Sequence, residues 1–131
     1  MTCEVTAGDE AVTGGIRVPM AEPRMLRLEL TLTSPAGLEE LDVVAVDADA
    51  TPVVHWNASA RRRPFKPDRV THVLRPGRMT SRFRAVGGGA DPRGARAVDV
   101  AVRVAPGATA GFVLHRAAYL GSGPAAGNER A

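Results

Sequence analysis

The residues of this chain that could take part in chemistry are few and lie far apart. Its three histidines, His55, His72 and His115, fall in three different predicted strands, so no local spacing gathers them as metal ligands. Cys3 is the only cysteine, which excludes an internal disulfide and a multi-cysteine metal site. We interpret Cys3 as a small apolar residue near a sheet edge, because no neighbouring histidine or lysine activates its thiol.

No catalytic motif accompanies these residues. The chain lacks a G-x-S-x-G turn, a phosphate-binding glycine loop before a helix, and an H-E-x-x-H pair. Asp47 and Asp49 could offer carboxylate oxygens to Ca²⁺, but the glycine and the bidentate glutamate of a dedicated calcium loop are missing. Whether they bind calcium stays open. We therefore predict a noncatalytic protein with no cofactor and assign it no metal site.

Arginine is the residue type that clusters. Between Arg61 and Arg96 the chain has eleven basic residues and two acidic ones, whereas its overall net charge is +3. The remainder is therefore acidic, and an anionic partner is expected on the basic side. Nucleic acid is disfavoured as that partner, because single-strand binding uses exposed aromatic rings and this stretch contains only Phe65 and Phe83.

Strands are expected to position these side chains. Leucine alternates with polar residues in 25–33 and valine does so in 97–104, which is the period of a half-buried strand. Turn signals at 34–37, 75–78 and 105–108 separate apolar runs. We predict hairpins of 70–75 with 79–86 and of 97–104 with 111–120. Other strands are expected at 38–47, 52–57, 3–6 and 15–18, an exposed basic loop at 58–67, and a mobile glycine loop at 87–94.

These elements predict the fold class. Seven to nine strands, spaced about ten residues apart and without a helical period, indicate an all-β domain, an antiparallel two-sheet β-sandwich of jelly-roll type. The domain is expected over residues 1–120, with a flexible tail at 121–131. Trp56 shares a strand face with Val54, which favours a core position. The other expected core residues are Leu26, Leu28, Leu30, Leu32, Phe83, Val98, Val100, Val102, Val104 and Phe112.

The sequence says less about the cellular location of the protein than about its fold. No apolar run is long enough to cross a bilayer, and the acidic start does not resemble a signal peptide. We expect a soluble chain without membrane insertion. It would be cytoplasmic as given, or extracytoplasmic if it belongs to a larger protein, and the sequence does not choose between these.

Strand phase also selects the candidate ligand-binding residues. Arg82 and Arg84 are predicted to project from the outer face of one strand, side by side and about 6 to 7 Å apart. Their planar guanidinium groups suit carboxylates, phosphates or sugar hydroxyls. His55, Asn57 and His115 are expected to face outward from other strands and to complete a shallow polar site.

The C-terminal two-thirds of the chain resembles a known class of module. The segments HVLRPGRMTSRFRAV and ARAVDVAVRVAPGATAGFVLHRAAYL are similar to the closing strands of carbohydrate-binding-like jelly-roll modules, in which a Leu-x-Pro-Gly turn precedes an alternating strand. Such modules are appended to actinobacterial cell-envelope glycosyltransferases. The resemblance covers roughly residues 25–120. It implies the jelly-roll type of sandwich and a noncatalytic module attached to, or working beside, a glycan-processing enzyme.

Two functions follow from these observations. The first is binding of carbohydrate, in particular cell-envelope polysaccharide. The alternative is protein association, as an oligomerisation domain or accessory subunit without a small-molecule ligand, since the open edges of a sandwich can pair with another chain. The ligand, the oligomeric state and the functional sheet face stay open.

Overall fold

The computed structural model describes residues 1–21, 25–80, 82–86 and 91–119. Over these ranges the chain forms strands and two 3₁₀ turns, η1 (Pro35–Gly37) and η2 (Pro92–Gly94). The predicted tail at 121–131 and part of the glycine loop at 87–94 lie outside the described residues. The strands are β1 (Thr2–Thr6), β2 (Val12–Pro19), β3 (Leu26–Thr33), β4 (Leu38–Val46), β5 (Pro52–Ser59), β6 (Arg69–Leu74), β7 (Arg84–Val86), β8 (Ala97–Val104) and β9 (Thr109–Tyr119).

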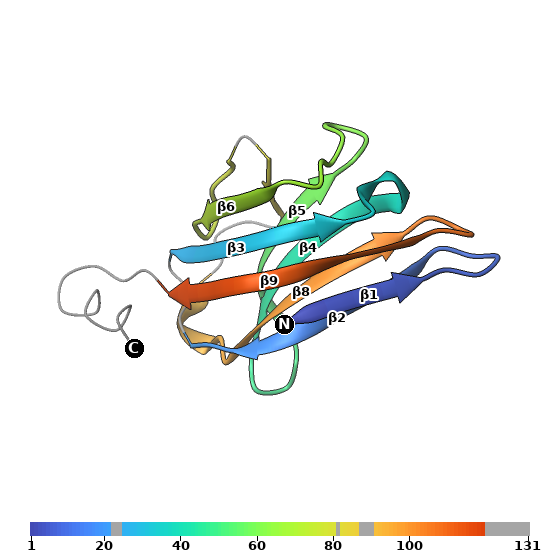
Figure 1. Ribbon diagram of the computed structural model, residues 1–131. Helices are drawn as coiled ribbons and strands as arrows, with labels where there is room; N and C mark the ends of the chain where they lie inside the picture. Colours follow the sequence, from blue (N-terminus) through green and yellow to red (C-terminus); the bar gives the residue numbers. More distant parts are fainter. Residues whose placement is uncertain (22–24, 81, 87–90, 120–131) are drawn as a thin grey trace.

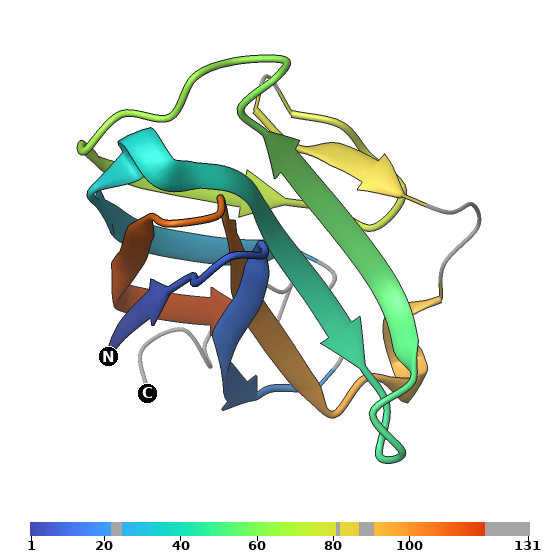
Figure 2. The ribbon, with the colours of Figure 1, turned by 90° about the vertical axis from the view of Figure 1, so that its right-hand side faces the viewer.

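The strands form two antiparallel sheets that pack face to face. One sheet has the order β1-β9-β3-β6 and lies toward the viewer in Figure 1, and the other has the order β2-β8-β4-β5-β7. Figure 2 shows the short β7 (yellow) beside β5 (green) at the edge of the five-stranded sheet. All connections except β4–β5 and β7–β8 cross from one sheet to the other. This arrangement, with β7 as an added edge strand, is a jelly-roll β-sandwich, so the predicted fold class is confirmed.

The core lies between the sheets and is built from the alternating rows. Every second residue of β3 and of β8 is buried, because side chains of a strand point to opposite faces. All ten expected core residues are buried, with exposed fractions of 0 to 7%. Trp56 is also fully buried, and its indole Nε1 donates a hydrogen bond to the carbonyl oxygen of Arg75 at 2.8 Å. Its predicted core position is therefore confirmed.

Both predicted hairpins are wrong, although their turns form. Gly77 and Gly107 have φ angles of 69° and 76°, as glycine permits, and backbone hydrogen bonds close both turns. However, β6 and β7 belong to different sheets, and so do β8 and β9. The valine row of β8 and Phe112 of β9 both lie in the core, so these strands face each other across it instead of pairing.

The predicted strand at 79–86 is also shorter than expected, because a turn replaces its first half. The amide of Thr80 donates to the carbonyl oxygen of Phe83, and the Phe83 amide donates to Oγ1 of Thr80, each at 2.9 Å. Met79 is 67% exposed, whereas Phe83 is buried as predicted. Arg82 therefore lies in a turn and not on the strand that carries Arg84.

The β5–β6 connection begins slightly later than predicted. Ala58 and Ser59 belong to β5, and Ala58 is buried. From Arg61 to Pro64 the chain is exposed, as expected of a basic loop, but Phe65 is half-buried and packs against the core. This connection thus forms part of the wall of the sandwich.

Candidate functional site

The outer face of the five-stranded sheet gathers most of the predicted binding residues. The strand register places one residue from each strand in a row across the sheet. Asn57 and Arg84, both predicted, are neighbours in this row, and Asp42 lies on the other side of Asn57. The full row is Gly15, Ala101, Asp42, Asn57 and Arg84.

Asp42 is the centre of the polar contacts on this face. Its Oδ1 accepts hydrogen bonds from His55 Nε2 at 2.7 Å and from Asn57 Nδ2 at 2.8 Å. The side chains of His55 and Asp42 are 33% and 21% exposed, so solvent still reaches both groups. Because a carboxylate can only accept, the proton of this imidazole lies on Nε2, and Nδ1 and the second carboxylate oxygen stay available to a ligand. The contacts hold the carboxylate in one orientation.

Arg84 supplies positive charge beside this group. It is exposed on the short strand β7, and its side chain forms no hydrogen bond or ion pair within the ranges described above. The amide of Asn57 thus has the fixed carboxylate of Asp42 on one side and the guanidinium of Arg84 on the other, so donors and acceptors lie in one row on this surface.

A second polar pair continues the face toward the opposite edge. Arg17 binds Asp99 in a bidentate arrangement, with Nε to Oδ1 at 2.6 Å and Nη2 to Oδ2 at 2.9 Å. Gly15, which has no side chain, and Ala101, which has only a methyl group, lie next to the pair and leave a shallow hollow of about 380 Å³. The face is thus polar and nearly flat.

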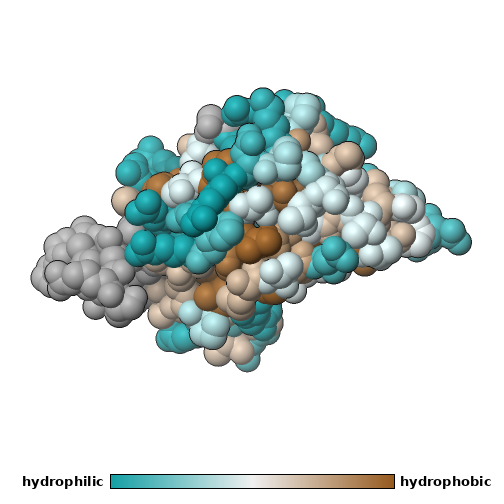
Figure 3. Space-filling model, in the orientation of Figure 1, coloured by the Kyte–Doolittle hydropathy of each residue, from teal (hydrophilic) through white to brown (hydrophobic). Residues whose placement is uncertain are grey.

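Two of the predicted residues do not join this face. His115 projects from β9 on the other sheet, where its Nε2 is 2.8 Å from Oγ1 of Thr31. Figure 3 shows that outer surface as a mixture of hydrophilic, intermediate and apolar side chains, with apolar patches between polar ones. Arg82 lies in the turn before β7, with its guanidinium carbon 3.9 Å from the centre of the Phe65 ring. The expected side-by-side pair of Arg82 and Arg84 does not form.

Sequence reasoning missed Asp42 and the Arg17–Asp99 pair. Asp42 interrupts the apolar run of β4, and Asp99 does the same in the valine row of β8. A charged residue at an outward position, flanked by buried apolar residues, was the available signal. The pairing of these residues across strands depends on register, which the sequence alone does not supply.

The remaining chemical candidates have structural explanations. Oδ1 of Asp47 accepts hydrogen bonds from the amides of Asp49 and Thr51, each at 2.9 Å, which closes the β4–β5 loop. Cys3 is half-buried on edge strand β1, as expected, and burial raises the pKa of its thiol. In the part of the chain that the structure describes, no three histidine, cysteine or carboxylate side chains lie close enough together to hold a metal ion.

Comparisons with known proteins give no family. No protein-family model matches this chain, and no curated protein matches its sequence. Among the described residues, no helix has the length and apolar character needed to span a bilayer.

Proposed function

We propose that this chain is a noncatalytic binding module that holds a carbohydrate on the outer face of its five-stranded sheet. The observation that carries the proposal is the carboxylate of Asp42, oriented by His55 and Asn57 and placed in register with the free guanidinium of Arg84. The similarity of the closing strands to carbohydrate-binding-like jelly rolls supports the same class of ligand. A module of this kind would work attached to, or beside, an enzyme that processes cell-envelope polysaccharide.

Sugar hydroxyls match this group of side chains. Each hydroxyl both donates and accepts hydrogen bonds, so it needs acceptors and donors close together. The second oxygen of Asp42 is an acceptor, Asn57 offers an amide, and Arg84 offers several coplanar donors. A uronic acid or another acidic sugar would place its own carboxylate against Arg84.

The affinity is expected to be weak. The face is shallow and polar, so a bound sugar releases little apolar surface from water. Trp56, the only tryptophan, is fully buried and cannot stack on a sugar ring. We therefore expect dissociation constants between micromolar and millimolar, which increase with salt for acidic glycans because exposed charges are screened.

An NMR titration of the full chain with neutral and acidic oligosaccharides tests this function. Amide shifts are expected to concentrate in β4, β5 and β7. Asp42→Asn and Arg84→Gln should each weaken binding about tenfold, the cost of one charge-assisted hydrogen bond. Arg78→Gln removes the same charge from an exposed turn and should leave binding unchanged.

Other outcomes decide against parts of the proposal. Binding that both variants retain in full would reject the site while keeping the function. An absence of shifts with every glycan, together with a stable dimer in light scattering, would favour the alternative function of protein association.

A further inference from the structure

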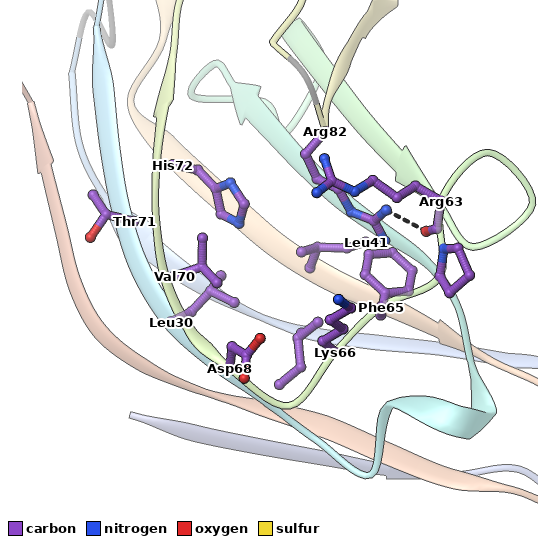
Figure 4. A pocket seen from close by; sticks show the side chains of 12 residues that line it. Leu30, Leu41, Arg63, Phe65, Lys66, Asp68, Val70, Thr71, His72 and Arg82 are labelled. Atoms are coloured by element: carbon purple, nitrogen blue, oxygen red, sulfur yellow. Dashed lines mark hydrogen bonds between the residues drawn. The ribbon is translucent and has the colours of Figure 1, made fainter.

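A second concave site lies at the side of the sandwich, away from the outer face of the five-stranded sheet. It is a cleft of about 270 Å³ between the two sheets, where β6 and β4 are bridged by the β5–β6 connection. Leu30 and Leu41, labelled in Figure 4, contribute to its apolar part. Leu32 also lines it. This volume is close to the lower limit of about 300 Å³ for small-molecule sites, so the cleft suits one small ligand and not a length of polypeptide.

The guanidinium of Arg82 lies at one end of the cleft. It stacks on the ring of Phe65, and its Nη1 donates a hydrogen bond to the carbonyl oxygen of Arg63 (Figure 4). Its Nη2 is buried and has no hydrogen-bond partner within the described residues. A buried N–H group without an acceptor costs free energy, and more so when it is charged. Arg82 therefore has an unused donor beside the cleft.

Positive charge predominates around the cleft. Arg63, Lys66 and Arg82 line it together with a single carboxylate, that of Asp68. Within the described ranges, none of the three cations forms an ion pair. Burial and the nearby charges of Arg63 and Arg62 lower the pKa of Arg82, which shows that the cations repel one another. An anion in the cleft would relieve this repulsion.

His72 adds no charge to the cleft at neutral pH. Its ring points into the cleft from β6 and meets Phe83 edge to face, with the ring centres 4.9 Å apart. Burial, with a smaller effect of Arg82, lowers the pKa of His72 to about 4. The neutral imidazole carries no charge, which leaves Arg63, Lys66 and Arg82 as the cationic groups that attract an anion.

We propose that this cleft binds a small organic carboxylate with an apolar body. The apolar body would lie against Leu30, Leu32 and Leu41, and the carboxylate would accept hydrogen bonds from Arg82 and attract Arg63. A guanidinium is well matched to a carboxylate because two parallel N–H donors face its two oxygens. The combination of an apolar floor and a cationic rim excludes both neutral polar molecules and alkyl ammonium ions as preferred ligands.

Three probes of related shape test the proposal on the full chain. Hexanoate has both the chain and the carboxylate, acetate lacks the chain, and hexylammonium reverses the charge. The imidazole signals of His72 and the ring signals of Phe65 in NMR spectra report on the cleft. Hexanoate should shift these signals in a saturable way, and acetate and hexylammonium should bind at least about tenfold more weakly.

Two variants and a matched control complete the experiment. Arg82→Gln should weaken hexanoate binding about tenfold or more, whereas Arg78→Gln, which removes an exposed arginine outside the cleft, should leave it unchanged. If Arg82→Gln does not fold, the double variant Arg63→Gln, Lys66→Gln tests the cleft instead. Both of these side chains are exposed, so their replacement should leave the fold intact. Equal binding of hexanoate and hexylammonium overturns the proposal. So does wild-type affinity in both cleft variants, or a lack of saturable shifts at His72 and Phe65.

Discussion

At the scale of single residues, side chains of the same type differ in burial and in their charged neighbours, and these differences decide what each one can bind. His55 donates its Nε2 proton to a carboxylate on an outer face, whereas His72 lies against Phe83 and near Arg82 inside a cleft. The same contrast separates Arg84, which is exposed and free, from Arg82, which is stacked and partly buried. These positions place Arg84 in the proposed glycan site and Arg82 in the proposed carboxylate site.

The low pKa of His72 predicts a pH dependence of stability. The folded protein binds a proton at this ring only near pH 4, whereas the unfolded chain binds it near pH 6.5. The unfolded state therefore holds more protons between these pH values. The stability that the neutral His72 ring contributes is fully present above about pH 6.5 and is lost as the pH falls to about 4. We expect the free energy of unfolding to fall by about 2 kcal/mol over this range because of His72. This value is reduced for solvent screening, since the ring is partly exposed.

Urea unfolding at pH 7 and pH 4.5 measures this contribution. His72→Gln should reduce the difference in unfolding free energy between the two pH values. His115→Gln provides the reference for removing an exposed histidine from the other sheet. An identical pH difference in wild type and His72→Gln would show that the ring is protonated in the folded state as readily as in the unfolded chain.

At the scale of elements, close contact between strands depends on a few small residues. Gly111 of β9 lies opposite Glu4 of β1, and a Cβ atom at Gly111 would come within 2.0 Å of the carbonyl oxygen of Cys3. Backbone atoms cannot yield as a flexible side chain does. A side chain at this position must therefore push β1 away from β9.

Gly111→Ala is expected to destabilise the fold by about 1 to 3 kcal/mol, the usual range for overpacking. Detachment of β1 should also make the thiol of Cys3 react faster with an aromatic disulfide reagent. Gly8→Ala is the matched control, because a Cβ atom there has nothing within 4 Å. A melting temperature and thiol reactivity equal to those of wild type would mean that β1 tolerates the displacement.

At the scale of the whole molecule, one core joins the two sheets. Buried residues of both sheets belong to a single cluster, and Trp56 lies within it. Because neither sheet keeps a core without the other, the domain should unfold as one cooperative unit.

Two optical probes test this cooperativity. Trp56 is the only tryptophan, so its fluorescence reports on the core around β5, whereas far-UV circular dichroism reports on the strands of both sheets. We expect the two urea transitions to coincide and the tryptophan emission to shift to longer wavelength on unfolding. Transitions with different midpoints would contradict a single core, and a spectrum dominated by helix would contradict the fold.

The sequence by itself determined most of the strands and which of their faces are buried; the first half of the predicted strand at 79–86 is the exception. The leucine row of β3 and the valine row of β8 alternate with polar residues, and this period is a local property of a strand. Trp56, Asn57 and Arg84 could be assigned to the correct faces for the same reason. The antiparallel sandwich followed from the number of strands and their spacing, and the jelly-roll type from the resemblance of the closing strands to known modules.

Only the tertiary structure decided which strands pair and which side chains meet. A Pro-Gly turn reverses the chain but does not determine whether the next strand stays in its sheet or crosses the core, so both predicted hairpins were wrong. The contacts of Asp42 with His55 and Asn57 depend on the register between β4 and β5. Likewise, Arg82 reaches the cleft because the Thr80–Phe83 turn removes it from the strand. Sheet membership and register are set by burial across the whole core, and no local pattern contains that information.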